Sequence, residues 1–521
     1  MTWRGAVAVA RLGAFGALGA LGALGALGLA PLRIPGALLQ AQGVPGGAAL
    51  PQTALEGVTV IDVSTGERLT DRVVVLRGGR IVEVTPRRGW RPARGTRVIP
   101  LRGRYVIPGL WDMHVEQALP LWKAAPLDSN AEFFHSLLLA HGVTGVRDVA
   151  GPMPVLRQWI RAIERGERLG PRMVYTGPKL GQGAVAPGAP DTLASEADVA
   201  AAVRALKAGG AYGAYLSDLD PRLMPALARA LQQAGLPLEG PVPPAWSLDA
   251  HVRHGLRVMD HLGGILFATV SDEARVRREH AVWLERPWWA TLGWKLGVME
   301  RPEFAVALAL PSQHDDSARA VFARLARDTV YQVPTLRLLG TLHRATDSLV
   351  RLPPEPFRLR PPRRPWRDFP AEPYPADHVM ARAYARMRWS VGAMQLAGVP
   401  LLAGSDTPNL WAMPGASLHD ELALLVGAGL TPLQALQSAT LRPAEYLRAT
   451  DSLGTVAAGR VADLLVLDGD PTVDIAHTRR IAMVVVRGTV LDPPALAALR
   501  ARGRAMAERI SAWWRQHPEG R

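Results

Sequence analysis

Eight short apolar runs alternate with helical patterns across residues 107–451, and this alternation limits the fold more than any other feature. A period of two residues is typical of strands, and a period near 3.6 is typical of helices. Regular alternation favours a parallel sheet, and eight units predict an α/β fold of the (β/α)8 barrel type. The strands are expected to end at Asp112–Glu116, Val146–Val149, Met173–Thr176, Ala214–Leu216, Leu238–Pro241, Val258–His261, Val333–Leu336 and Leu401–Asp406.

Helical patterns separate most of these runs, for example at Glu132–Leu139, Ser195–Leu206, Arg222–Ala234 and Ala381–Leu396. Ser195 is a suitable N-cap for the second of them, because its hydroxyl can accept a bond from a free backbone amide. In a barrel of this kind, catalytic residues collect at the C-terminal ends of the strands. Candidate site residues are therefore expected at those ends.

β-rich sequence flanks the barrel segment on both sides. Residues 57–106 contain short apolar strands with Gly78-Gly79 at a hairpin turn, and residues 452–495 have the same character. The two segments together predict one small β-sandwich domain built from both ends of the chain. Residues 496–521 follow as a helical, arginine-rich C-terminal tail.

Residues 1–42 have the plan of a secretory signal peptide. Arg4 and Arg11 precede an uncharged run from Leu12 to Leu32, and small residues around Ala41 offer a cleavage site. We therefore predict an exported protein, periplasmic or extracellular, with a linker at residues 43–56. The run is also long enough to span a bilayer, so an uncleaved membrane anchor is the alternative. A mis-assigned start codon is a third explanation.

The net charge and the cysteine content limit the binding partners and the chemistry that we expect of this protein. The net charge is +14, but the excess is mostly scattered arginine without interleaved aromatic residues, so no nucleic-acid partner is predicted. The absence of cysteine excludes disulfides and thiolate chemistry. We expect a small-molecule or short-peptide substrate, and contact with a membrane only through an uncleaved N-terminus. A homo-oligomer is compatible with the sequence.

The stretch Tyr105–Glu116 places two possible metal ligands on one strand. Pro108-Gly109 is expected to form a turn that ends an apolar strand. A second short apolar run then leads to His114 and Glu116. Alternation along a strand puts these two side chains on one face, where neighbouring residues can share a metal ion. Taken alone, the same pattern also fits a solvated strand end.

Several segments resemble the metal-dependent amidohydrolase superfamily, nearest its imidazolonepropionase-like and Xaa-Pro dipeptidase-like members. They are PGLWDMHVE (108–116), GVTGVRDVAG (142–151), VMDHLGG (258–264), VPTL (333–336), LLAGSDTP (401–408), SLHDELALLVGAGLTPLQALQSAT (417–440), GTVAAGRVADLLVLDGDP (454–471) and VVVRGTVLD (484–492). The resemblance covers about residues 57–495. It implies a (β/α)8 barrel, a β-sandwich from both chain ends, and hydrolysis of C–N bonds in amides, cyclic amides or dipeptides.

The resemblance also implies six metal-ligand positions, of which this chain keeps three. His114 matches the first histidine of the family's H-x-H, His261 the histidine of strand six, and Asp406 the aspartate after strand eight.

The other three positions depart from the family. Glu116 replaces the second histidine, Tyr215 stands at the position of the carboxylated lysine, and Pro241 replaces the histidine of strand five. Tyrosine cannot form a carbamate and proline offers no side-chain donor atom. The carboxylated lysine is therefore absent, and a binuclear centre of the family type is not expected. Glu239, two residues before Pro241, is a conceivable substitute ligand.

One divalent ion (Zn, Mn or Fe) remains compatible with the residues that are left. The metal-ligand candidates are His114, Glu116, His261 and Asp406. The resemblance implies that Asp406 acts as general base on a metal-activated water and that His261 orients the water or stabilises the oxyanion. The alternative is a pseudoenzyme that keeps the fold and binds a small molecule or peptide without turnover.

Neighbouring residues are expected to have structural roles. Lys179 is expected at the surface, Arg147 and Asp148 are expected to pair with each other, and His419 and Glu421 are expected to support the last strand by hydrogen bonding.

Overall fold

The computed structural model describes part of the chain: residues 51–118, 127–181, 191–217, 219–242, 246–284, 306, 309–343, 345–348, 350, 353–354, 357 and 373–516. The predicted signal peptide or membrane anchor at 1–42, and residues 43–50 of the linker, lie outside these residues. Among the helices of the described ranges, none combines the length and apolar character that a membrane span requires.

One eight-stranded sheet takes strands from both ends of the chain, in the order β15-β14-β13-β5-β1-β2-β3, with β4 paired to β1. Antiparallel pairing of β13 with β5, for example Val466 opposite Val106, joins the two ends. The strands are β1 (Gln52–Ile61), β2 (Arg68–Arg77), β3 (Arg80–Pro86), β4 (Arg97–Pro100), β5 (Tyr105–Pro108), β13 (Leu464–Leu467), β14 (Ile481–Val486) and β15 (Thr489–Leu491). The sandwich arrangement itself stays a prediction.

Two details of this sheet bear on the expected boundaries. Gly78 and Gly79 have φ of +57° and +77° and form the turn between β2 and β3, as their left-handed backbone requires. β1 begins at Gln52, inside the range expected to be a linker, because Gln52 pairs with Arg77 of β2 and Thr53 with Arg97 of β4. The linker is therefore shorter than the sequence indicates.

Two parallel sheets follow, one in the order β6-β7-β8 and the other in the order β12-β11-β10-β9. Their strands are β6 (Leu110–Val115), β7 (Val143–Asp148), β8 (Arg172–Tyr175), β9 (Ala214–Tyr215), β10 (Leu238–Gly240), β11 (Leu256–Asp260) and β12 (Tyr331–Val333). Seven of the eight expected strands are thus present. Parallel pairing explains their nearly continuous burial, because helices cover parallel strands.

Backbone hydrogen bonds connect the two parallel sheets at both edges. At one edge, Tyr212 N donates to Tyr175 O (2.7 Å) and Leu180 bridges Leu216. At the other edge lies the eighth expected strand, Leu401–Asp406, which forms only isolated bridges and no regular strand. Its backbone nevertheless contacts both neighbours, since Leu402 N donates to Gln332 O (2.8 Å) and Met113 N donates to Ala403 O (2.9 Å).

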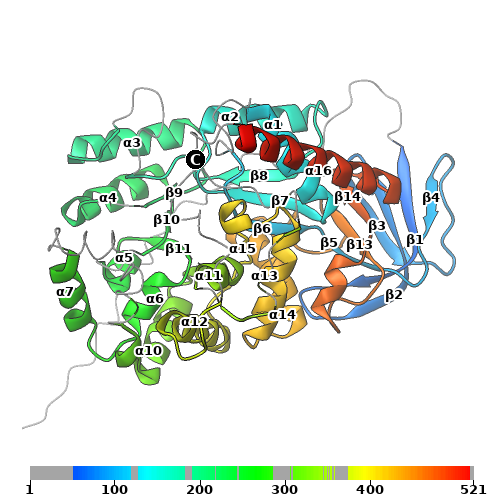
Figure 1. Ribbon diagram of the computed structural model, residues 1–521. Helices are drawn as coiled ribbons and strands as arrows, with labels where there is room; N and C mark the ends of the chain where they lie inside the picture. Colours follow the sequence, from blue (N-terminus) through cyan, green and yellow to red (C-terminus); the bar gives the residue numbers. More distant parts are fainter. Residues whose placement is uncertain are drawn as a thin grey trace, which may run out of the picture. The chain divides into compact units, whose positions relative to one another are not determined.

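Along the chain, most helices follow a strand and precede the next one. The helices are α1 (Leu127–Ala140), α2 (Met153–Glu164), α3 (Glu196–Ala208), α4 (Met224–Ala234), α5 (Leu248–Arg253), α6 (Gly263–Ala268), α7 (Glu273–Leu284), α10 (Asp315–Arg327), α11 (Leu336–Leu342), α12 (Val379–Leu396), α13 (Ala416–Gly427), α14 (Pro432–Ser438), α15 (Leu441–Tyr446) and α16 (Pro493–Gln516). In Figure 1 many of them lie at the periphery, for example α3, α4, α7 and α10. The 3-10 turns are η2 (Pro221–Leu223), η3 (Leu310–Ser312), η5 (Asn409–Trp411) and η6 (Ile475–Arg479). Ser195 is the N-cap of α3 and forms a reciprocal capping box with Asp198.

The C-terminal helix α16, red in Figure 1, packs against α1. Gly503 permits the contact, because a Cβ at this position would lie 2.4 Å from a methyl carbon of Leu137. The tail begins at Pro493, three residues before the expected boundary at 496, and proline suits the first turn of a helix.

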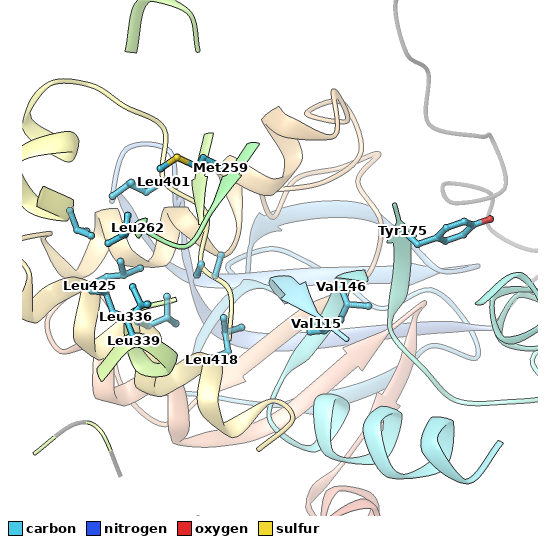
Figure 2. Close-up of a cluster of buried hydrophobic side chains, with 14 of the residues drawn as sticks. Val115, Val146, Tyr175, Met259, Leu262, Leu336, Leu339, Leu401, Leu418 and Leu425 are labelled. Atoms are coloured by element: carbon cyan, nitrogen blue, oxygen red, sulfur yellow. The ribbon is translucent and has the colours of Figure 1, made fainter. Parts of the chain in front are cut away.

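The apolar core joins the strands to the surrounding helices. Figure 2 shows part of it, where Leu336 and Leu339 of α11 lie near Leu418 and Leu425 of α13. This packing fixes α11 directly after β12. It therefore helps to position the residues between β12 and α11, which contact the site described next.

Candidate metal centre

Three side chains that follow or end strands meet at one place: His114, His261 and Asp406. One potential ligand atom from each lies within 4.8 Å of the others. Backbone hydrogen bonds fix their positions, since Asp406 N donates to His114 O and His261 N donates to Val333 O, both at 2.9 Å. These are the three positions at which the sequence keeps the family pattern, and the structure brings them together.

Two of the three residues have a left-handed backbone. His261 has φ of +63° and Asp406 has φ of +55°, and Thr335, which contacts His261, has φ of +51°. Such conformations cost non-glycine residues about 1–3 kcal/mol each and persist only where the surroundings enforce them. Here they turn the chain at the strand ends, at the place where the three side chains meet.

His114 is fully buried, and its two ring nitrogens have different surroundings. Nδ1 lies 2.7 Å from Asp260 Oδ1, and since a carboxylate accepts, Nδ1 donates. Nε2 lies 3.1 Å from Asp406 Oδ1, close enough for an ion pair but without the geometry of a hydrogen bond. Burial lowers the pKa of His114, but the charges of Asp406 and Asp260 outweigh it and raise that pKa to about 10 in the absence of an ion.

Arg147 of β7 holds Asp260 in place. Its guanidinium donates to Asp260 Oδ1 (3.1 Å) and Oδ2 (3.0 Å), to Glu239 Oε2 (2.9 Å) and to Met113 O (2.6 Å). Glu239 also accepts a short hydrogen bond from the Tyr446 hydroxyl. Both carboxylate oxygens of Glu239 therefore accept hydrogen bonds, one from Arg147 and one from Tyr446. Glu239 is not one of the three grouped residues.

The expected pair of Arg147 with Asp148 is wrong. Asp148 instead accepts backbone amide bonds from Gln117 (3.0 Å) and Gly151 (2.7 Å). Successive side chains of a strand point to opposite faces, so neighbours such as these have separate surroundings.

Glu116 pairs with a cation. Lys179 Nζ lies 2.5 Å from Glu116 Oε1, and Asn409 Nδ2 donates to Glu116 Oε2 at 3.1 Å. The same Asn409 amide donates to Asp406 Oδ1 at 2.9 Å. Lys179 is thus part of the site, not the surface residue that the sequence predicts, although its side chain remains 22% exposed. Glu116 itself is not among the three grouped ligands.

The remaining departures from the family lie close by. Tyr215 is 2% exposed, its ring centroid lies 6.1 Å from that of His114, and Lys179 Nζ lies 5.4 Å from the tyrosine ring. Burial raises the pKa of Tyr215 well above its ordinary value. Pro241 follows the last residue of β10.

Helix α13 supports the site indirectly, but not through the last strand as expected. Both oxygens of Glu421 accept backbone amides at the start of α11, from Leu336 (2.9 Å) and Arg337 (2.8 Å). Thr335, just before α11, places its hydroxyl 2.8 Å from His261 Nδ1. His419 contacts Thr478 Oγ1 and His141 O instead of the last strand, both at 2.9 Å.

The residues present fit a divalent ion. Two imidazoles and a carboxylate are a donor set that suits Zn, Mn or Fe and leaves positions open. Ligand atoms about 2.1 Å from a tetrahedral ion lie roughly 3.4 Å apart, close to the 3.1 Å between His114 Nε2 and Asp406 Oδ1. A histidine that donates its other nitrogen to a carboxylate is also a common arrangement of metal ligands.

Sequence reasoning missed the partners of the three grouped residues, namely Arg147 with Asp260, Thr335, Asn409 and Lys179. Two signals were available, since Asp260 directly precedes His261 and Asn409 lies three residues after Asp406.

Comparisons with known proteins agree with this picture. A model of the amidohydrolase family matches residues 388–491. The chain is 39% identical over 90 residues to adenine deaminase 2 of Jannaschia sp. (strain CCS1), a match that covers 17% of this chain and 14% of that protein. It therefore spans about one seventh of the length of this curated relative.

Solved structures extend the likeness over most of the chain. A bottromycin amidohydrolase superposes with a TM-score of 0.62 and 25% identity, covering 92% of this chain and 95% of the other. A Xaa-Pro dipeptidase with methionine bound in its active site gives a TM-score of 0.58 at 19% identity, covering 85% and 100%.

The fold and the three grouped residues therefore define an α/β protein with a possible site for a divalent ion. The family match at residues 388–491 and the likeness to a bottromycin amidohydrolase confirm the resemblance to the metal-dependent amidohydrolase superfamily.

Proposed function

We propose that this protein hydrolyses C–N bonds with the help of one divalent ion held by His114, His261 and Asp406. The observation that carries the proposal is the state of His114. Asp260 occupies its Nδ1, while its buried Nε2 lies 3.1 Å from Asp406 Oδ1, a contact without the geometry of a hydrogen bond. A nitrogen prepared in this way is suited to bind an ion.

Charge balance also supports a single ion. A continuous line of side-chain contacts crosses the site and contains four carboxylates and two cationic side chains. When His114 is neutral, the net charge of this line is −2. One divalent ion would cancel that charge. The members are Glu239, Arg147, Asp260, His114, Asp406, Asn409, Glu116 and Lys179. Buried charges without such compensation are costly.

The protein side chains would then share the reaction as follows. An ion bound there would lower the pKa of a water and polarise the scissile carbonyl. Asp406, oriented by the Asn409 amide, accepts the proton of the water and passes it to the leaving nitrogen. His261, held through Nδ1 by Thr335, has its other nitrogen free to bind the ion.

The comparisons support a proposed substrate class. Amides, cyclic amides and dipeptides are the substrates that the likeness to a Xaa-Pro dipeptidase and a bottromycin amidohydrolase suggests. The short match to adenine deaminase favours the same bond type, since deamination also breaks a C–N bond. A small molecule or short peptide is therefore the proposed partner.

The closed (β/α)8 barrel belongs to the same proposal. The two parallel sheets are linked at one edge by the bridge of Leu180 with Leu216. At the other edge, Leu401–Asp406 contacts both β12 and β6. Such links at both edges support a closed eight-stranded ring, with the sandwich domain built on the strands from both chain ends.

A second candidate function is binding without turnover. Glu116, Tyr215 and Pro241 replace three of the ligand positions implied by the family, which favours a pseudoenzyme of the same fold. Both candidates keep the fold and differ only in catalysis.

Hydrolysis assays separate the two candidates. The purified protein, supplied in turn with Zn²⁺, Mn²⁺ and Fe²⁺, should release product from a panel of dipeptides and cyclic amides. Asp406→Asn should reduce the rate at least a hundredfold, because it removes the general base. His314→Asn, which removes an exposed histidine, is the matched control and should keep full activity. Inertness of the wild type with all three ions would favour the binding protein.

Export stays a prediction, with an uncleaved anchor as its alternative. N-terminal sequencing of the mature protein should give a start near Gln42.

A further inference from the structure

The Glu116 carboxylate lies beside the candidate ligands but is occupied. Its side chain is 4% exposed, Lys179 Nζ lies 2.5 Å from Oε1, and Asn409 donates to Oε2 at 3.1 Å. Because Asn409 also donates to Asp406 Oδ1, one amide group holds the two carboxylates next to each other. Glu116 therefore stands within reach of the same place as Asp406, yet both of its oxygens already have partners.

Lys179 is fixed by its surroundings. Its neighbour Leu180 bridges Leu216 and donates its backbone amide to Tyr215 O at 2.8 Å. The ammonium group lies 5.4 Å from the centroid of the Tyr215 ring, which adds a cation–π contact. The backbone contacts of the segment after β8 and the ring of Tyr215 thus direct Lys179 toward Glu116.

The ammonium and a divalent ion would compete for one carboxylate. An ammonium at 2.5 Å uses one lone pair of Glu116 Oε1 and offsets the negative charge of the carboxylate, so this carboxylate attracts a divalent cation less strongly while the contact persists. Both cations also repel each other at the short distances of this site, and more strongly where burial lowers the dielectric. The structure therefore contains an internal cation at the side of the site where a fourth ligand would join.

We propose that Lys179 holds Glu116 out of the ligand set, so that the ammonium and the divalent ion compete for this carboxylate and Lys179 sets the ion affinity. The proposal rests on the ion site described above. Lys179 acts in it as a positioning residue, because it works through Glu116.

Titration with Mn²⁺ and Co²⁺ tests the proposal on the full chain. Lys179→Met should lower the dissociation constant for Mn²⁺ at least tenfold, because Glu116 becomes free to bind. The double variant Lys179→Met with Glu116→Gln should return to the wild-type constant. The visible spectrum of bound Co²⁺ should change in Lys179→Met and match the wild type in the double variant, since only a new ligand alters the coordination.

Two controls separate this effect from loss of charge and from misfolding. Lys207→Met removes an exposed lysine of α3 and should leave affinity and spectrum unchanged. Lys179→Arg keeps the positive charge and should also stay near the wild type. Thermal melting of each variant confirms that it is folded.

The outcomes are distinct. An unchanged Mn²⁺ constant and Co²⁺ spectrum in Lys179→Met would overturn this proposal and leave the proposed function standing. If the wild type bound no ion while Lys179→Met bound one, the proposed function would fail and the competition by Lys179 would be supported.

Discussion

At the residue scale, the site depends on how His114 is held. A buried imidazole between two carboxylates can either carry a proton or bind an ion through its free nitrogen, and the two states exclude each other. In the absence of an ion, Asp406 and Asp260 raise the pKa of His114 to about 10 despite its burial. An ion would therefore displace a proton from His114, which makes ion binding stronger at higher pH.

Asp260→Asn tests the support behind His114. The amide keeps the size of the carboxylate but cannot hold the Nδ1 proton with a full charge, and it weakens the bonds from Arg147. Loss of such a supporting carboxylate typically lowers metal affinity by about 10- to 100-fold. We expect that loss in a Zn²⁺ titration. An affinity equal to that of the wild type would show that Asp260 does not orient His114.

The sequence predicted the grouped residues but not their partners. His114 was singled out from its place at the end of a predicted strand, whereas His261 and Asp406 were assigned from motifs that resemble the amidohydrolase superfamily. Lys179, Arg147 and Asp260 contact residues from other strands, at separations of 63 to 146 positions along the chain. Such contacts depend on the register between strands, which a single sequence does not contain.

At the scale of elements, strand ends position the three candidate ligands, and helices fix the strand ends. α13 holds the start of α11 through Glu421, and the residue before α11, Thr335, contacts His261. Burial raises the pKa of Glu421 to about 8, although two backbone amides favour its charged form. This contact links two helices to one ligand.

Glu421→Ala should destabilise the fold by about 2 kcal/mol, because two amides at the start of a helix lose their buried acceptors. Urea unfolding monitored by circular dichroism measures the change. Glu421→Gln keeps one acceptor oxygen and is the control, for which we expect a smaller loss. Equal stability of all three proteins would contradict the role of Glu421 as a helix cap.

Most elements could be predicted because their pattern is local. The helix over Glu196–Ala208 follows from its apolar spacing and its serine cap, and the Gly78-Gly79 turn follows from glycine geometry. Leu401–Asp406 was predicted as a strand from the same type of pattern. Its pairing is limited to isolated bridges, and Asp406 leaves the extended region with φ of +55°. That turn is set by the tertiary structure.

At the scale of the whole molecule, buried histidines make the fold sensitive to acid. Burial lowers the pKa of His135 to about 3, of His141 to about 4 and of His419 to about 3. The unfolded chain binds these protons near pH 6.5, whereas the folded chain does not. Stability is therefore complete above pH 6.5 and falls as the pH decreases toward these lower values.

His135→Phe should reduce this acid sensitivity. Each buried histidine costs about 2 kcal/mol at pH 5 relative to pH 8, since 1.5 units separate pH 5 from the unfolded pKa. The phenylalanine variant should recover about that amount in urea unfolding at pH 5 while packing against Trp159. His314→Asn, which replaces an exposed histidine, serves as the control. Its free energy of unfolding should fall between pH 8 and pH 5 by the same amount as in the wild type. If the free energy of unfolding of His135→Phe fell as much between pH 8 and pH 5 as that of the wild type, burial of His135 would not be a source of the acid sensitivity.

The fold of the chain matches that of solved amidohydrolase structures, whereas its candidate ligand positions differ from the family pattern. The superposition on a bottromycin amidohydrolase covers 92% of the chain, while Glu116, Tyr215 and Pro241 change the ligand set. The apolar pattern that fixes strands and helices tolerates such changes, because the three positions stand at or just after the ends of strands and leave the alternation within the strands intact. A single sequence can therefore identify the architecture and still leave the reaction to experiment.

The number of divalent ions bound per chain tests the central claim most directly. After equilibrium dialysis against Mn²⁺, elemental analysis of the wild type should give one ion per chain. His261→Ala should give almost none, because it removes one of three ligands. A wild type without bound ion, or a His261→Ala variant that still binds one, would contradict the proposed metal centre.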